Sequence, residues 1–399
     1  MTGRMTELSW DPISAEYKDD PHAVWRLLRD EAPVYYNPTH DFYALSRFVD
    51  VDAAHRDPKT FSSAHGTVLE LMGPDILGGD LMIFTDPPDH TRLRRLVSKA
   101  FTPRRMAVLE SEIRNLCADL LESQRGNDTF DYVQDFGARV PAIVIAALLG
   151  VEPAHREEMR ELIDGSFHLD PEKGMANDVS AQFMGQLHAY IGVELEARQK
   201  SPRDDMFTDL LQGEILDDDG QKRRLTFEEA TMFSLLLASA GTETVARLIG
   251  WAGVVLAANP DQRTELVSDS ALIPNTVEEL LRFEAPSPVQ GRWTTREIEL
   301  NGQVIPSDSK VLLITGSAGR DERTFPDADR FDIHRKMDHH LSFGYGIHFC
   351  LGAALARLKG RIALEETIRR FPQWSVDLEK AVPLHTSTVR GYTKLPISV

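Results

Sequence analysis

Apolar residues recur at helical spacing in several long segments between Asp89 and Asn259, and turns such as the charged stretch 216–220 separate these segments. Apolar side chains three and four residues apart share one face of a helix, so this part of the chain is predicted to be mainly helical. A further amphipathic segment at 353–371 predicts another helix close to the carboxyl end.

Short extended segments are predicted at three places. Val34 to Ser46 holds two runs of aromatic and aliphatic residues on either side of the turn-prone segment 37–41, which indicates a hairpin. From Arg292 to Ile314 the pattern changes to short alternating strands separated by Asn-Gly and Ser-Asp, and residues 394–399 also look extended. The fold class predicted from the pattern is therefore mainly α with a small β portion.

The composition narrows the class of protein. The chain has 399 residues and a net charge of −18, which argues against a nucleic-acid binder. Two cysteines exclude a disulfide framework and favour a reducing compartment. The first residues lack the apolar run of a signal peptide, and no apolar stretch reaches the ~18 residues of a membrane span. These features predict a cytoplasmic protein that does not bind a membrane.

No internal repeat, low-complexity linker or change in composition marks a boundary, so residues 1–399 are predicted to form a single domain.

The two cysteines lie in very different surroundings. Cys117 lies in the helical run 106–121 among leucines and isoleucines, as expected of a small buried apolar residue. Cys350 lies in FGYGIHFCLG, residues 343–352, directly before the predicted helix 353–371. The helix dipole and free backbone N–H groups stabilise a thiolate at such a position, which makes Cys350 a candidate metal ligand.

A long central helix is predicted from Thr226 onward. Thr226 and Glu229 form a capping box, and no stop signal precedes Asn259, which gives about 33 residues or roughly 50 Å. Near its middle, residues 240–244 bring a glycine and two threonines into an apolar face that includes Leu237 and Leu248. A local loss of helical regularity there would let a ligand or water insert, although a plain packing glycine is the alternative.

The cysteine loop resembles the haem-binding signature of the cytochrome P450 haem-thiolate monooxygenases, with Phe343, Gly346, His348, Cys350 and Gly352 at the matching positions. The resemblance covers nearly the whole chain. It implies the cytochrome P450 fold, with haem b held between the long central helix and the loop of Cys350, the iron ligand. It also implies that Ala240 and Gly241 lie beside the cofactor.

The resemblance assigns further roles. Glu243 and Thr244 match the acid–alcohol pair that delivers protons to bound oxygen, a task that suits a carboxylate and a hydroxyl. Haem propionates need cations, and the matching residues are His90, Arg94, Arg292 and His348, although such arginines are often only solvated surface. Glu279 and Arg282 match a buried structural pair joined by a third residue, which is expected to be Arg330.

The substrate pocket is expected in variable regions rich in apolar side chains. The candidate lining residues are Leu69, Leu71, Met72, Ile76, Leu77, Met82, Phe167, Leu237, Ala240 and Val289. Such a lining suits a hydrophobic small molecule held by shape, of terpenoid, steroid, fatty-acid, aromatic or polyketide type.

The resemblance implies hydroxylation with O2 and two electrons from NAD(P)H, passed through a ferredoxin reductase and a ferredoxin to a monomeric enzyme. The stretch 91–105 holds six basic residues and no acidic one, and further basic residues flank the cysteine loop. Together they predict a surface that steers an acidic ferredoxin. The basic residues are Arg92, Arg94, Arg95, Lys99, Arg104, Arg105, Arg335, Lys336, Arg357, Lys359 and Arg361. Lys359 departs from the family pattern, in which an acidic residue is common.

Other functions fit less well. Phe349 occupies the third glycine position of a dinucleotide-binding motif, and the sequence has no serine-hydrolase elbow, zinc-protease motif or P-loop. A non-catalytic haem sensor would need neither Glu243 nor Thr244, and peroxide-driven members of the family usually lack that pair. A Thr244→Ala variant would distinguish these alternatives.

Overall fold

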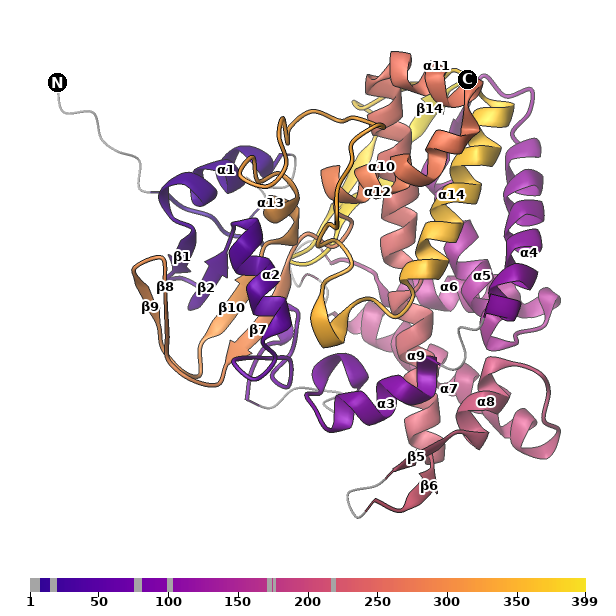
Figure 1. The fold of residues 1–399 in the computed structure, drawn as a ribbon. Helices are drawn as coiled ribbons and strands as arrows, with labels where there is room; N and C mark the ends of the chain where they lie inside the picture. The colour runs from indigo at the N-terminus through magenta and orange to yellow at the C-terminus, as the bar shows by residue number, and fades with distance from the viewer. Residues whose placement is uncertain are drawn as a thin grey trace.

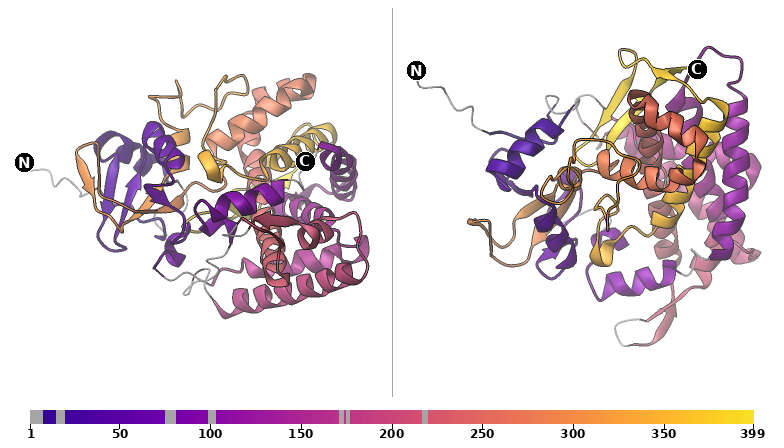
Figure 2. Two further views of the ribbon diagram at one scale, coloured as in Figure 1. Left: turned by 60° about the horizontal axis from the view of Figure 1, so that its bottom comes forward. Right: turned by 45° about the horizontal axis from the view of Figure 1, so that its top comes forward.

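The computed structural model describes residues 8–14, 20–74, 81–98, 103–170, 174, 177–216 and 220–399. Ile76 and Leu77 of the predicted pocket and Lys99 of the predicted basic stretch lie outside the described residues. Figure 1 shows most of the helices gathered into one body, with a smaller lobe that contains a sheet beside it, and the two views of Figure 2 agree. This arrangement confirms the predicted fold class, mainly α with a small β portion.

The helices are α1 His22–Glu31, α2 Phe48–Arg56, α3 Asp89–Ser98, α4 Pro103–Glu122, α5 Arg139–Leu149, α6 Arg156–Ser166, α7 Asp178–Lys200, α8 Met206–Gln212, α9 Phe227–Ala240, α10 Glu243–Ala258, α11 Pro260–Ser268, α12 Ile273–Phe283, α13 Thr315–Gly319 and α14 Ala353–Arg370. The helix predicted at 353–371 is α14.

The main sheet has the strand order β1-β2-β10-β7-β3, in which β2 and β10 are parallel and the other neighbours are antiparallel. Its strands are β1 Val34–Asn37, β2 Phe42–Leu45, β3 Phe61–Ser62, β7 Gln290–Thr294 and β10 Lys310–Leu313. A second sheet has the order β11 Ser375–Val376, β14 Pro396–Ser398, β4 Thr129–Asp131. The two-stranded sheets are β5 Glu214–Leu216 with β6 Lys222–Arg224, β8 Ile298–Leu300 with β9 Gln303–Ile305, and β12 Val382–His385 with β13 Arg390–Lys394.

The predicted hairpin is confirmed as β1 and β2. The side chain of Asn37 accepts hydrogen bonds from the backbone N–H groups of Thr39 and His40, and Asp41 adopts a left-handed φ of 49°. Asparagine and aspartate are favoured at such positions because their short polar side chains bond to the nearby backbone. The strands predicted between Arg292 and Ile314 are also present.

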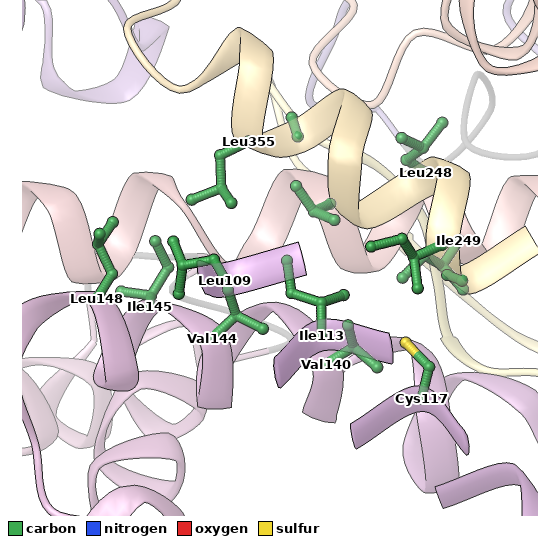
Figure 3. Packing of buried hydrophobic residues seen from close by; sticks show 14 of the residues in the cluster. Leu109, Ile113, Cys117, Val140, Val144, Ile145, Leu148, Leu248, Ile249 and Leu355 are labelled. Carbon is green, nitrogen blue, oxygen red and sulfur yellow. The ribbon is translucent and has the colours of Figure 1, made fainter. Parts of the chain in front are cut away.

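The helical body surrounds one large apolar cluster. Figure 3 shows residues of α4, α5, α10 and α14 converging in it, among them Ile113, Val144, Leu248 and Leu355. Cys117 is fully buried in the same cluster, which confirms its expected role as a small packing residue. Close packing of this kind fixes α14 against α4, α10 and α12, and thereby fixes the start of α14, where Cys350 lies.

The predicted central helix is wrong in one respect, because it is broken in the middle. The capping box of Thr226 and Glu229 begins α9 as expected, but α9 ends at Ala240 and α10 begins at Glu243. Gly241 leaves no room for a side chain, since a Cβ there would lie 2.6 Å from the side chain of Ile145. Loss of regularity at residues 240–244 was the possibility that the sequence raised.

Among the described residues, two helical stretches are long and apolar enough to cross a membrane, 132–149 and 227–258. Both are mostly buried inside the helical body, as the central helices of a large core are.

Candidate active site

The loop that carries Cys350 is closed by its backbone. The N–H of Cys350 donates to the carbonyl of Phe343 at 2.8 Å. Gly344 and Gly346 have φ values of 65° and 68°, a region that residues with side chains rarely adopt. A Cβ on Gly346 would also clash with the carbonyl oxygen of His55. The loop therefore requires glycine at 346, and it holds the cysteine at a fixed place ahead of α14.

Charged groups surround the sulfur of Cys350, which is half-buried. Burial raises the pKa of the Cys350 thiol, whereas the backbone N–H of Gly352 and the positive charges of Arg94 and Lys359 lower it. Gly352 is the residue directly before α14, so its N–H belongs to the positive end of the helix dipole. These groups favour negative charge on the sulfur when a cation binds it.

Several basic side chains lie close together beside the loop of Cys350. The rings of His90 and His348 lie with their centroids 4.2 Å apart, and Arg292 is 5% exposed. In the described part of the chain, neither ring nitrogen of His90 has a hydrogen-bond partner, and Nε2 of His348 has none either. Buried polar groups normally have hydrogen-bond partners, so these unpaired nitrogens indicate that the cluster binds an anionic group.

Burial and mutual repulsion dominate the electrostatics of this cluster. Burial, together with the charge of Arg94, lowers the pKa of His90 to about 4, and burial lowers the pKa of Arg292 to about 10. Asp86 is the nearby carboxylate, but its oxygens accept hydrogen bonds from the hydroxyl of Ser62 at 2.5 Å and the N–H of Ser63 at 3.0 Å.

His55 belongs to the same cluster and was missed by the sequence analysis. It is 3% exposed, neither of its ring nitrogens has a hydrogen-bond partner among the described residues, and burial together with Arg292 lowers its pKa to about 3. The available signal was its position four residues after Val51 on the buried face of α2, where a histidine is uncommon.

The break between α9 and α10 carries the second group of predicted residues. The hydroxyl of Thr242 donates to the carbonyl of Ala238 at 2.8 Å, and that of Thr244 donates to the carbonyl of Ala240 at 3.4 Å. Glu243 forms an ion pair with Arg247 one turn along α10, with Nη2 and Oε1 2.7 Å apart. Ala240, the last residue of α9, is exposed.

The predicted pocket residues divide into two groups. Met82 is buried in the cluster of the helical body, and Phe167 and Leu237 pack against it. Leu69, Met72 and Val289 instead pack with the residues that cover the main sheet. Leu71 is 49% exposed, so it does not share the apolar surroundings of the others.

The predicted structural trio needs one correction. Glu279 and Arg282 are fully buried and joined by two hydrogen bonds of 2.7 Å. The third member is Arg335, whose Nε lies 3.1 Å from Oε1 of Glu279. The side chain of Arg330 is exposed, and only its carbonyl oxygen takes part, as an acceptor for both Arg282 and Arg335.

The predicted basic surface is also smaller than expected. Ion pairs hold Arg335 to Glu279, Arg357 to Glu278 and Arg361 to Glu110, and Lys359 is buried. Arg95 and Lys336 are exposed. The acidic partners come from distant parts of the chain, so a count of basic residues in the sequence could not reveal them.

Comparison with known proteins then decides the family. Residues 39–396 match the sequence profile of the family described as Cytochrome P450. The chain belongs to the cytochrome P450 family. It is 36% identical to the vitamin D(3) 25-hydroxylase of Pseudonocardia autotrophica over 400 residues, 98% of this chain and 96% of that protein.

Two solved cytochrome P450 structures show the same fold. CYP109Q5 from Chondromyces apiculatus superposes with a TM-score of 0.87 and 34% identity, over 96% of each chain. CYP109E1 from Bacillus megaterium in complex with corticosterone gives 0.84 and 30%, over 95% of this chain and 98% of that chain. The protein is therefore a cytochrome P450 monooxygenase, and the cofactor of this family is haem b.

The residues of this chain fit haem b. A haem needs an axial ligand for iron and cations for two propionates. Burial raises the pKa of the Cys350 thiol, but a helix start and positive charges beside it act against that rise. It stands beside a buried basic cluster in which both ring nitrogens of His90 and Nε2 of His348 lack hydrogen-bond partners among the described residues. Both requirements are met by side chains that are otherwise hard to explain in a buried position.

Proposed function

We propose that this cytochrome P450 hydroxylates a hydrophobic small organic molecule with O2 and two electrons that come from NAD(P)H through a ferredoxin. The observation that supports it most strongly is the buried basic cluster of His90, Arg292 and His348 beside the loop of Cys350. Haem b, when bound, supplies the oxygen activation that no side chain can perform.

Each residue near the cofactor has a proposed task. The thiolate of Cys350 would ligate the haem iron, and thiolate ligation favours cleavage of the O–O bond. His90, Arg94, Arg292 and His348 would bind the propionates through charge-assisted hydrogen bonds. Phe343 and Gly352 in the cysteine loop, and Ala240 and Gly241 at the helix break, would contact the haem without charge.

Thr244 and Glu243 are proposed to move protons to the oxygen site. The bond from the Thr244 hydroxyl to the carbonyl of Ala240 is long, at 3.4 Å, so the hydroxyl can exchange it for another acceptor. Arg247 binds one oxygen of Glu243 through both Nε and Nη2, which fixes the direction of the carboxylate. A carboxylate held in one direction and a hydroxyl that can change its acceptor are suited to pass protons.

The substrate is proposed to be mainly hydrocarbon. The apolar residues Met82, Phe167 and Leu237 on the helical side support this, because such a surface holds a ligand by shape. One relative is named for vitamin D(3) and one similar structure holds corticosterone, so a steroid-like molecule is the first to test. Terpenoid, fatty-acid, aromatic and polyketide substrates belong to the same proposal.

A ferredoxin, itself reduced by a ferredoxin reductase, is proposed to dock beside the cysteine loop of a monomeric, cytoplasmic enzyme. Arg95 and Lys336 offer exposed positive charge there. A groove of about 530 Å³, lined in part by Met337, the residue after Lys336, reaches Tyr345, Gly346 and Phe349 of the loop, which would shorten the path for an electron. An acidic partner would associate faster at low salt.

The test uses Thr244→Ala and the matched control Thr231→Ala. Thr231 lies on α9 and bonds to the carbonyl of Phe227 at 2.9 Å, so both variants remove a similar hydroxyl but only one removes it at the break. With a substrate found by its spin-state shift, Thr244→Ala should divert most electrons to hydrogen peroxide, and Thr231→Ala should not. Full coupling of NAD(P)H to product in Thr244→Ala would contradict the proposed relay.

A further inference from the structure

A lysine is buried against the break in the central helix. Lys359 lies on α14, nine residues after Cys350, and is 1% exposed. Its Nζ lies 2.7 Å from the carbonyl oxygen of Gly241, to which it donates a hydrogen bond. The next residue, Gly360, lies against Leu248 of α10 and Val277 of α12, so this face of α14 is packed into an apolar interior.

Burying an ammonium group is costly unless it is paired or hydrogen-bonded. Burial lowers the pKa of Lys359 to about 7, and the negative charge of Cys350 acts against that fall. Burial of Lys359 therefore lowers the stability of the fold unless its hydrogen bond to the carbonyl of Gly241 offsets the cost.

The hydrogen bonds at the break show what that bond contributes. The side chains of Thr242, in the break, and Thr244, the second residue of α10, donate to the carbonyls of Ala238 and Ala240, so both bonds are local to the central helix. The carbonyl of Gly241 differs, because its donor comes from another helix. In a regular helix that carbonyl would accept from the N–H four residues on, at Val245.

We infer that Lys359 is a positioning residue that keeps the central helix open at Gly241 and thereby sets the position from which the Thr244 hydroxyl acts. The ammonium group of Lys359 donates to the carbonyl of Gly241, which in a continuous helix would accept from the N–H of Val245. It also links the break to α14, the helix whose start carries the cysteine loop. The inference rests on the proposed function for the role of the break in proton delivery. The geometry of the break does not depend on that function.

The decisive variant is Lys359→Met, which keeps the length of the side chain and removes the donor. The gap at Gly241–Thr242 should close in its crystal structure, and the peroxide yield per NAD(P)H should rise roughly tenfold, because small displacements of reacting groups have effects of this size. Lys200→Met, at an exposed lysine at the end of α7, is the control and should change neither quantity.

Lys359→Gln separates the hydrogen bond from the charge. Its amide can still donate to the carbonyl of Gly241, so coupling should return to within about twofold of the wild type if the bond is what matters. Coupling as poor as in Thr244→Ala would overturn the inference in favour of a charge effect. This variant carries the test if Lys359→Met does not fold.

The absorption spectrum of the dithionite-reduced protein under carbon monoxide distinguishes a failure of this inference from a failure of the proposed function. The band of thiolate-ligated haem should be present in the wild type and in both lysine variants. Its absence from the wild type would refute the proposed function. Its presence in the wild type together with an open break and normal coupling in Lys359→Met would refute the role of Lys359 alone.

Discussion

Arg94 donates a hydrogen bond from Nη2 to the carbonyl oxygen of Phe349, at 2.6 Å. This bond joins α3 to the residue directly before Cys350, although the two lie 255 positions apart in the chain. The same guanidinium lies close enough to Cys350 for the charge of the cysteine to raise its pKa, against the larger lowering effect of burial. One side chain therefore fixes the cysteine loop and supplies positive charge to the proposed haem site.

Replacing Arg94 by alanine should weaken haem binding. We expect haem transfer to apomyoglobin to become roughly tenfold faster, since supporting contacts of a metal site usually have effects of at least this size. Arg92→Ala is the control, because Arg92 pairs with the exposed Asp89 on the same helix at 3.3 Å. Equal transfer rates for the wild type and Arg94→Ala would show that Arg94 does not hold the cofactor.

The corrected structural trio predicts opposite outcomes for two arginines that lie close together. Arg335→Ala removes the 3.1 Å bond to buried Glu279 and bonds to three carbonyl oxygens, and should lower the free energy of unfolding by about 1.5–3 kcal/mol. Arg330→Ala keeps the carbonyl that the trio uses, so its effect should stay within about 0.5 kcal/mol. Urea unfolding followed by circular dichroism measures both, and a larger loss in Arg330→Ala would restore the original assignment.

The lowered pKa of Glu278 predicts how the stability of the fold changes as the pH falls. Burial alone would raise its pKa, but hydrogen bonds from His340 and Arg357 outweigh this and lower the pKa from 4.5 to about 2. A lowered carboxyl pKa stabilises the folded state fully above pH 4.5, and this contribution is lost as the pH falls through about 2.

The Glu278→Gln variant should therefore be less stable at pH 7 by about 1–3 kcal/mol, because it gives up charge-assisted hydrogen bonds. Between pH 4.5 and 2 it should lose less stability than the wild type. Thermal unfolding at a series of pH values gives both curves. Parallel curves would mean that the lowered pKa of Glu278 does not contribute.

What could be predicted from the sequence was local in origin. The hairpin at 34–45, the capping box at Thr226 and the glycine-lined loop of Cys350 each depend on residues a few positions apart. The prediction of an unbroken helix from 226 to 259 was wrong, although residues 240–244 had raised a local loss of regularity as a possibility. One hydrogen bond at the break, to the carbonyl of Gly241, comes from Lys359, on a helix more than 100 residues later. No periodicity in residues 226–259 contains that information.

Contacts between distant segments also explain the errors in the predictions for the charged residues. Arg335 and Arg357 were expected at a basic surface, yet Glu279 and Glu278 of α12 neutralise them across more than 50 positions. His55 joins the basic cluster through the packing of α2 against the cysteine loop. Pairings between distant segments decide which charges stay available for a partner or a cofactor, and a single sequence does not list them.

The central claim is that Cys350 ligates the haem iron. The absorption spectrum of the dithionite-reduced protein under carbon monoxide tests it most directly. The wild type and Cys117→Ala, which removes a buried thiol in the core, should both show the strongly red-shifted Soret band of thiolate-ligated haem. Cys350→Ala should lose that band. A band that persists in Cys350→Ala, or that is missing from the wild type, would contradict the account.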